Sequence, residues 1–422
     1  MKEFETVIGY ASVKTELERI CDVLKNPEKY ARLGVNPPSG LLLHGDPGVG
    51  KTTMAKCFIA ACGMKSFTCR KSKSNGDFVN EITQTFEEAK QAAPAIVFLD
   101  DMDKYANGDD MHRNSEEYVT VQSCIDGVKG TGVFVLATAN NLRHLPDSLL
   151  RAGRFDKIIE VKTPSGKEAE DIIAYYLGQK RALADVSVGE IAKILNGKSC
   201  ADLETVINEA GIYAGFAGRD AIEMDDIIRA CMRVIFNAPE GLEGYSDEVV
   251  EKIAYHEAGH AVVAEILEPG SVNIVSVCTH TGRTGGIASL AQSPDYFTSM
   301  HYMENRVRCL LGGKAATEVR YGEADVGANS DLERAFDIVE RFVDHYCASG
   351  FDRWTMSETS NATLERKERH IYAYMERYYA ETRKILIQNR EFLDKLAAAL
   401  VEKKTIIARD IRAIKESCSI VA

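Results

Sequence analysis

Between residues 41 and 52 the chain reads Leu41-Leu42-Leu43-His44-Gly45-Asp46-Pro47-Gly48-Val49-Gly50-Lys51-Thr52. The leucine run is long enough for a buried strand, and a helix-like segment follows from Thr53 to Ala61. A strand, the pattern G-x-x-x-x-G-K-T and a helix, in that order, predict a phosphate-binding loop rather than a glycine-rich surface turn.

The chemistry of such a loop assigns roles to its residues. Glycines let backbone N–H groups close around phosphate oxygens at a helix N-terminus. Lys51 is expected to reach the β- and γ-phosphates, and Thr52 to hold Mg²⁺. We therefore assign to ATP or ADP the residues Gly45, Asp46, Pro47, Gly48, Val49, Gly50, Lys51, Thr52 and Thr53.

Two more apolar runs end in polar residues. Residues 95–99 lead into Asp100 and Asp101, and residues 133–138 are followed closely by Asn140. A carboxylate at the end of such a strand can bind Mg²⁺ through water, which is the role expected of Asp100. Asp101 stands where a base would orient the attacking water, and Asn140 can contact that water or the γ-phosphate.

Helical patterns alternate with these strands, at residues 78–92 and 115–128, and a helical stripe covers much of residues 1–37. This alternation predicts a parallel sheet with helices on both faces. Residues 164–237 are expected to be all helical, with a capping box at Ser199-x-x-Asp202. Residues 237–241 have the composition of a linker.

Arg151 and Arg154 follow the third strand closely. They could be solvated surface residues. In an oligomeric ATPase they would instead reach a neighbour's nucleotide, where such fingers contribute about a thousandfold or more in rate.

The downstream half contains Tyr255-His256-Glu257-Ala258-Gly259-His260-Ala261, within a helical pattern. Residues four apart share one helix face, so His256 and His260 can bind one metal ion together. Glu257 can then serve as general base toward a water on that metal. Two chance histidines on a solvated helix are the alternative.

Composition limits the remaining possibilities. The chain has 422 residues and a net charge of −12, which suggests two to four domains and argues against nucleic acid as the main partner. Its 11 cysteines include no C-x-x-C pair, as expected for free thiols in a reducing compartment. No signal peptide or membrane-length apolar run is present, so we expect a cytoplasmic chain, unless it is a fragment of a longer, anchored protein.

These motifs, in this order, resemble the FtsH-type ATP-dependent zinc metalloproteases. The resemblance extends from about Phe4 to residue 415 and includes residues 201–210, 311–316 and 328–335. It implies an α/β AAA+ domain with a parallel sheet (1–163), a helical lid (164–237) and a mainly α-helical zinc metallopeptidase domain (238–422). It also implies Zn²⁺, ATP and Mg²⁺ as cofactors, protein substrates and a six-membered ring of identical chains.

The resemblance also supplies a third zinc ligand, Asp331. The residues alone leave His280, Glu318 and Asp325 as equal candidates. Ser330-x-x-Glu333 is a possible capping box, which would place Asp331 in the first turn of a helix. Residues 285–290 resemble the edge strand along which the family lays its substrate.

Three departures from the family pattern carry predictions. Asp101 stands where the family usually has Glu, one methylene longer, so we expect ATP to bind well and turn over slowly. In the stretch aligned with the family's central-pore loop, residues 73–78, no aromatic precedes the glycine; Phe78 could substitute, or could be a core residue of the next helix. The transmembrane helices that usually precede the ATPase are not in the sequence, which favours soluble substrates.

Two alternative functions remain open on the sequence. One is a zinc peptidase whose ATPase is slow or serves only assembly, suggested by Asp101 and the altered pore loop. The other is a nucleotide-gated chaperone that no longer cuts, which the intact His256, Glu257 and His260 oppose.

Overall fold

The computed structural model describes residues 2–71, 75–106, 116–151, 153–183, 185–238, 245–278, 286–290, 299–323, 326–348, 350 and 361–421. Internal contacts divide the chain into two compact units. The first contains residues 1–181 and 196–208, and the second contains residues 182–195 and 209–422. Among the described helices, none combines the length and the apolarity that a membrane span requires.

A five-stranded, all-parallel sheet forms the centre of the first unit, in the order β2-β3-β4-β1-β5. Its strands are β1 (Gly40–His44), β2 (Lys65–Cys69), β3 (Ala95–Leu99), β4 (Val133–Ala139) and β5 (Lys157–Glu160). The predicted parallel sheet is confirmed, and its three central strands are the three apolar runs of the sequence. The edge strands β2 and β5 were not predicted, because most of their residues are exposed and break the apolar pattern.

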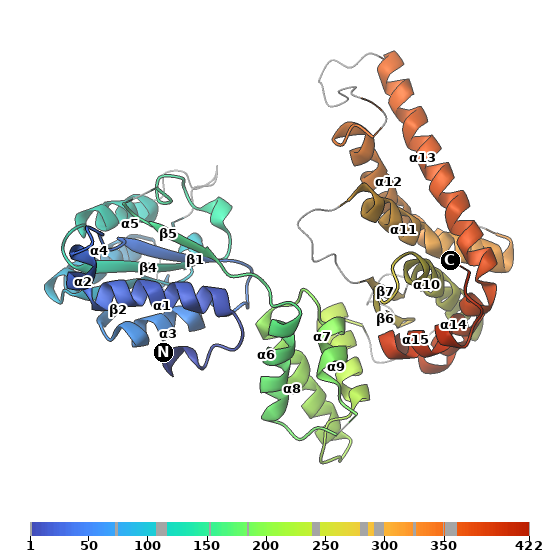
Figure 1. Ribbon diagram of the computed structural model, residues 1–422, viewed down its shortest axis with the longest axis horizontal. Coiled ribbons are helices and arrows are strands. Elements are labelled where there is room, and N and C mark those ends of the chain that lie inside the picture. The colour runs from blue at the N-terminus through green and yellow to red at the C-terminus, as the bar shows by residue number, and fades with distance from the viewer. Residues whose placement is uncertain are drawn as a thin grey trace. The chain divides into compact units, whose positions relative to one another are not determined.

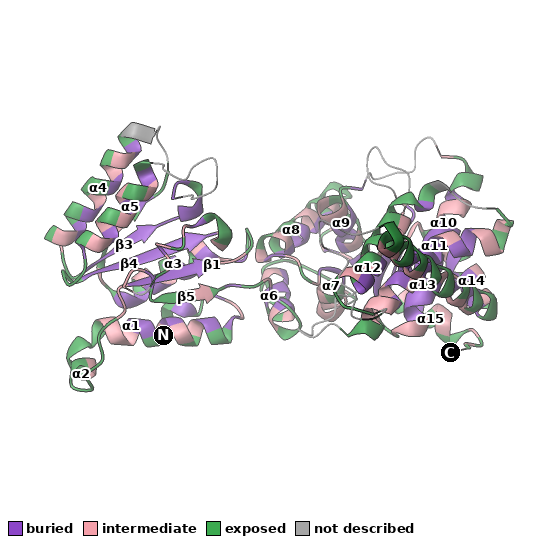
Figure 2. Ribbon diagram, turned by 90° about the horizontal axis from the view of Figure 1, so that it is seen from above, coloured by how far each residue is buried: buried purple, intermediate pink, exposed green. Residues whose placement is uncertain are grey.

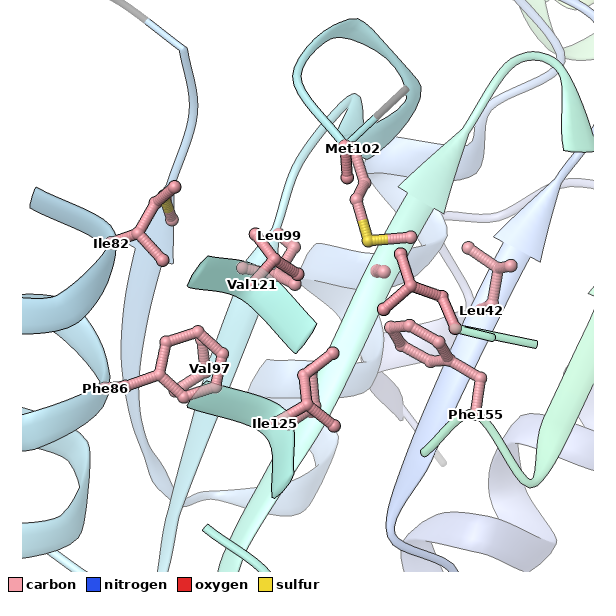
Figure 3. Close-up of a cluster of buried hydrophobic side chains, with 14 of the residues drawn as sticks. Leu42, Ile82, Phe86, Val97, Leu99, Met102, Val121, Ile125 and Phe155 are labelled. Carbon is pink, nitrogen blue, oxygen red and sulfur yellow. The ribbon is translucent and has the colours of Figure 1, made fainter. Parts of the chain in front are cut away.

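Helices cover both faces of this sheet (Figure 1). On one face lie α1 (Ala11–Lys25) and α3 (Lys51–Cys62), and Phe58 of α3 packs on Phe134 of β4. On the other face α4 (Asn75–Gln91) and α5 (Glu116–Gly127) cover a core that includes Phe86, Val97 and Ile125 (Figure 3). Figure 2 shows the central strands β1, β3 and β4 as buried along almost their whole length.

The helical stripe expected over residues 1–37 is interrupted. A short 3₁₀ turn (Lys2–Phe4) precedes α1, and Pro27 begins a separate short helix, α2 (Pro27–Ala31). Proline is favoured in the first turn of a helix because it has no N–H to leave unpaired there, which explains the break. Two further 3₁₀ turns, Met102–Lys104 and Leu142–His144, follow β3 and β4.

Residues 164–237 are helical, as predicted, in four helices: α6 (Lys167–Gly178), α7 (Val188–Ile194), α8 (Cys200–Phe216) and α9 (Met224–Phe236). The capping box before α8 is confirmed. The backbone N–H of Ser199 donates to Asp202 over 3.0 Å, and that of Asp202 donates back to the Ser199 hydroxyl over 3.2 Å. The start of α8 belongs to the first unit, where the N–H of Ala201 donates to the carbonyl of Gly48 in the phosphate loop.

The rest of the second unit is mainly helical. Its helices are α10 (Asp247–Leu267), α11 (Met300–Tyr321), α12 (Asn329–Asp344), α13 (Asn361–Gln388), α14 (Arg390–Lys403) and α15 (Ala408–Glu416), with a 3₁₀ turn at Val326–Ala328. A small antiparallel sheet, β7-β6-β8, contains β6 (Val272–Ser276), β7 (Ile287–Leu290) and β8 (Thr405–Ile407). The expected edge strand is β7, which pairs with β6 on one side only; Gly285 lies outside the described residues.

Two facing glycines let α10 and α11 cross closely. A Cβ at Gly259 would lie 2.3 Å from the Gly312 carbonyl oxygen, and a Cβ at Gly312 would lie 2.7 Å from that of Gly259. These distances are well inside van der Waals contact, so neither position can hold a side chain without parting the helices. This crossing brings α11 against the histidines of α10.

Candidate active sites

The predicted metal ligands converge on one point. Nε2 of His256 lies 3.1 Å from Nε2 of His260, and Oδ2 of Asp331 lies 3.3 Å and 3.2 Å from these two nitrogens. Tetrahedral zinc with bonds of about 2.0–2.2 Å would hold its donor atoms about 3.3 Å apart. The three donors therefore fit three corners of a zinc site, and no other group of three metal-ligating side chains this close occurs among the described residues.

The neighbouring helix α11 fixes the two rings. Nδ1 of His260 donates to the backbone carbonyl of Cys309 over 2.6 Å, which leaves the Nε2 lone pair for a metal. Gly313 lies directly over the triad, because a Cβ there would come within 2.5 Å of Nε2 of His256 and 2.6 Å of Nε2 of His260. The site is thus enclosed by backbone on the α11 side.

Glu257 is 4% exposed and shares a cleft with the triad. Burial raises the pKa of its carboxyl, and the backbone N–H of Gly286 donates a hydrogen bond to it. A Cβ at Gly286 would lie 2.4 Å from Cγ of Glu257, so only glycine allows this approach of the chain just before β7. A carboxylate beside a metal-ligand triad, with its affinity for protons raised, is suited to general-base work.

Asp331 lies in the first turn of α12, as predicted, but the predicted capping box is wrong. The N-cap is Ala328, which makes no side-chain cap bond, and Ser330 is already inside the helix. Glu333 instead accepts a hydrogen bond from the side chain of Asn329 over 3.0 Å. Burial would raise the pKa of Asp331, but the close contact of its carboxylate with the two imidazole rings outweighs burial and lowers that pKa, which keeps the carboxylate charged.

Among the other candidate ligands, Glu318 is engaged elsewhere. Its carboxylate accepts hydrogen bonds from Lys314 and from the Tyr379 hydroxyl. His280 and Asp325 lie outside the described residues.

The phosphate-loop residues meet at the carboxyl ends of β1, β3 and β4. Asp100, which is 5% exposed, accepts hydrogen bonds from the hydroxyls of Thr52 (3.0 Å) and Thr138 (2.9 Å). Nζ of Lys51 donates to the carbonyls of Gly45 and Asp46 and to Oδ1 of Asn140, each over 2.8 Å. Hydroxyl and carboxylate oxygens beside a lysine suit Mg²⁺ and phosphate, so this donor set fits a magnesium nucleotide.

Asp101 lies at the same edge of the sheet, in a left-handed conformation with φ of 53°. Its backbone N–H donates to the hydroxyl of Thr138, and its carboxylate pairs with Lys104 at 2.7 Å and Arg70 at 3.7 Å. Partial burial would raise the pKa of Asp101, but Lys104, Arg70 and Asn140 outweigh it and lower that pKa. The short side chain is therefore held by cations of its own subunit.

The two predicted arginine fingers differ in environment. Arg154 pairs with Asp126, at 3.1 Å and 2.7 Å, and donates to the carbonyl of Ser148. Arg151 is exposed. A reach by Arg154 into another subunit would require breaking its contacts with Asp126.

A pulling role for Phe78 is wrong for this structure. Its ring is fully buried and packs edge-on against Tyr105, with centroids 5.0 Å apart. The alternative, a core residue of α4, is the one observed. Lys73 and Ser74 of the same stretch lie outside the described residues.

Several residues at these sites were not indicated by the sequence patterns. Thr138 connects Asp100 to Asp101, and its place at the end of a buried strand could have suggested this. Beside the phosphate loop, a small cavity of about 100 Å³ is lined by residues remote in sequence, including Ile8, Tyr10, Ile172 and Cys200. No local pattern links such residues, because only the fold brings them together.

Comparison with known proteins agrees with this geometry. A model of peptidase family M41 matches residues 244–414. A model of the ATPase family associated with various cellular activities matches residues 41–163, and an AAA+ lid domain model matches residues 185–229.

Curated relatives match along nearly the whole chain. The ATP-dependent zinc metalloprotease FtsH of Caldicellulosiruptor bescii is 32% identical over 97% of this chain and 71% of its own length. FtsH 2 of Symbiobacterium thermophilum is 33% identical over 97% of this chain and 74% of its own. FtsH 2 of a Thermoanaerobacter species is 29% identical over 98% of this chain and 82% of its own length. These matches favour an ATP-dependent protease over both alternative functions, and the chain belongs to the FtsH family of ATP-dependent zinc metalloproteases.

Proposed function

We propose that His256, His260 and Asp331 hold the catalytic zinc and that Glu257 is the general base for peptide hydrolysis. The observation that carries this proposal is the triangle of Nε2, Nε2 and Oδ2 atoms, with sides of 3.1–3.3 Å, beside a buried carboxylate. Three protein ligands leave one coordination position of a tetrahedral metal for water or substrate, as in catalytic zinc sites.

The chain's own residues supply the proton transfers. Zinc, when bound, supplies Lewis acidity to water and to the scissile carbonyl. The carboxylate of Glu257 takes the proton of the attacking water and delivers it to the nitrogen of the departing amine. The open edge of β7 can pair with an extended substrate, and the backbone N–H of Gly286 orients the base at one end of that strand.

On the nucleotide side, residues 45–53 hold the phosphates, and Thr52 and Asp100 hold Mg²⁺. The 3.0 Å contact between these two side chains supports the pairing. Asp101 and Asn140 orient the attacking water, and the cavity lined by Tyr10, Ile172 and Cys200 receives the nucleobase.

The assembly is a homo-hexameric ring built from three domains, 1–163, 164–237 and 238–422. In such a ring Arg151 and Arg154 act at the neighbour's nucleotide, and the exposed position of Arg151 supports this role more directly than that of Arg154. Protein substrates would be unfolded by ATP hydrolysis and cut at the zinc sites. Light scattering with ATP should give the mass of six chains.

One set of assays tests the proposal. Casein cleavage should require ATP hydrolysis and stop with a chelator, so a non-hydrolysable analogue should not support it. Glu257→Gln should abolish cleavage while keeping about one zinc per chain, and His256→Ala should lose the zinc. Undiminished cleavage by Glu257→Gln would remove the proposed mechanism.

A further inference from the structure

The zinc cleft carries two arginines for which the proposed catalytic mechanism has no use. The cleft has a volume of about 400 Å³, and the metal triad, Glu257 and the edge strand β7 line part of it. Arg306 of α11 and Arg334 of α12 line it as well. All of these residues belong to the second unit.

Arg306 lies on the face of α11 that points to the zinc ligands. Arg306, Leu310 and Gly313 are spaced i, i+4 and i+7, so they share one face of the helix. Gly313 contacts the two histidines, and Arg306 lies about 10 Å from it along the helix axis, at 1.5 Å per residue. Arg306 is half-buried, and no carboxylate of the described residues lies within 4.0 Å of its guanidinium.

Arg334 lies one turn beyond the ligand Asp331 on α12. Its Nη1 is 3.9 Å from Oδ1 of Asp331, the carboxylate oxygen that does not face the histidines. The side chain is 61% exposed, so its contact with Asp331 is long and weak. The guanidinium is therefore available to a second carboxylate arriving in the cleft.

The described lining of the cleft does not share the negative net charge of the whole chain. Within the described lining, the arginines Arg306 and Arg334 balance the carboxylates Glu257 and Asp331. A divalent zinc then leaves the cleft positive, although the chain carries a net charge of −12. A concave site with charge of one sign concentrates ligands of the opposite sign. The apolar part of the lining includes Ile287 and Leu290 of β7, and Leu310, which lies between Arg306 and Gly313 on the same face of α11.

We infer that the two arginines select peptide segments that carry Asp or Glu within about three residues of the scissile bond, since an extended chain rises about 3.3 Å per residue. An apolar side chain at an alternate position would pack against the apolar lining residues Leu290 and Leu310. This inference rests on the proposed peptidase function and specifies the substrate class of the same site. Arg306 and Arg334 are thus specificity residues, which recognise the segment without taking part in bond cleavage.

Short fluorogenic peptides would test the inference on the assembled protein. Each peptide carries Glu at one flanking position, and its partner carries Gln there, which keeps the size and removes the charge. We expect kcat/KM to be about three- to tenfold higher for the Glu peptides, mainly through KM, because partly exposed ion pairs contribute modestly. The preference should shrink as salt rises, because screening weakens exposed pairs.

Variants assign the preference to the two arginines. Arg306→Gln and Arg334→Gln should each reduce it, and the double variant should cut Glu and Gln peptides equally while keeping its zinc content. Arg412→Gln, on an exposed position of α15, is the matched control and should keep the full preference. Equal cutting of Glu and Gln peptides by the wild type, or an undiminished preference in the double variant, overturns the inference.

A binding assay separates this inference from the proposed function. Fluorescence anisotropy of the same peptides with zinc-loaded Glu257→Gln measures the charge preference without cleavage. If no peptide is cut by the wild type, the peptidase proposal fails, and the anisotropy still decides the charge preference. If peptides are cut but Glu and Gln partners bind equally, the charge inference fails and the peptidase proposal stands.

Discussion

Replacing Gly313 with alanine would place a methyl group among the proposed zinc ligands. The new Cβ would lie 2.5 Å from both Cε1 and Nε2 of His256 and 2.6 Å from Nε2 of His260. Favourable contacts of such atoms begin at about 3.5 Å, so each ring would have to move by roughly 1 Å. Metal–ligand distances tolerate only about 0.2 Å, so the triad would no longer fit zinc.

Gly313→Ala should weaken zinc binding more than it destabilises the fold. Changing a single outer-shell partner typically lowers metal affinity by 10–100-fold, and Gly313→Ala displaces two ligands, so we expect a loss of about 100-fold or more. Stability of the zinc-free protein should change less. Overpacking costs about 1–3 kcal/mol, and replacing a helical glycine by alanine regains about 0.5–1 kcal/mol.

The assay measures zinc per chain after dialysis against buffered zinc, together with thermal unfolding of the zinc-free protein. The matched control is Gly215→Ala in α8, where a Cβ meets no atom within 4 Å. That control should be slightly more stable and keep its zinc, and both variants should keep ATPase activity. Wild-type zinc affinity in Gly313→Ala would refute the tight fit of α11 over the ligands.

Four other changes have defined outcomes. Asp101→Glu should raise steady-state phosphate release about tenfold or more, since a positioned base contributes at least about 100-fold; a fall in rate would contradict the view that Asp101 is too short. Phe78→Ala should lower the free energy of unfolding by about 3–5 kcal/mol because it empties a buried site. Phe78→Leu should be more stable than Phe78→Ala and should degrade casein normally. A selective loss of degradation in the leucine variant would restore a pulling role. Gly259→Ala should lower the unfolding midpoint by the equivalent of about 2–3 kcal/mol, because its Cβ meets the Gly312 carbonyl at 2.3 Å; an unchanged midpoint would show that the helices part freely. Burial would raise the pKa of Asp226, but hydrogen bonds from Arg219 outweigh burial and lower that pKa, so this pair stabilises the fold above about pH 4 and loses that effect as pH falls through the lowered pKa. Asp226→Asn should therefore cost about 2 kcal/mol in urea unfolding at pH 7 and less at pH 3, and an equal cost at both would exclude the pair as the cause.

The sequence predicted those parts of the fold that rest on local patterns. The strands β1, β3 and β4 contain buried apolar runs, and His256 and His260 share a helix face through a spacing that any helix imposes. The edge strands β2 and β5 have exposed, mixed residues, so only pairing with their neighbours defines them. Asp331 was placed through a family resemblance, and the capping box offered in its support is absent, since the N-cap of α12 is Ala328 and Ser330 lies inside the helix.

Long-range packing explains what the sequence could not show. Nothing near Gly313 or Arg306 in the sequence relates them to histidines about fifty residues earlier, because the relation is made by the crossing of α10 and α11. The burial of Phe78 likewise depends on Tyr105 and on the faces of α4 and α5, which no local window contains. The sequence shows that Arg334 stands three residues after the expected ligand Asp331 on a helix. Only the structure shows that its side chain lines the zinc cleft, where it can bind a substrate carboxylate.

On the proposed zinc site and the inferred charge preference, one helix, α11, links zinc binding to substrate choice. It closes the ligand triad with Gly313, orients His260 through the Cys309 carbonyl and carries Arg306 two turns away. Because a helix moves as a rigid element, a shift that parts it from α10 should loosen the zinc and displace the arginine together. Gly259→Ala should therefore weaken zinc binding and the preference for Glu peptides in parallel, whereas Arg306→Gln should change the preference alone. Separate responses of zinc affinity and preference in Gly259→Ala would show that Arg306 is positioned by its own side-chain contacts and not by the helix crossing.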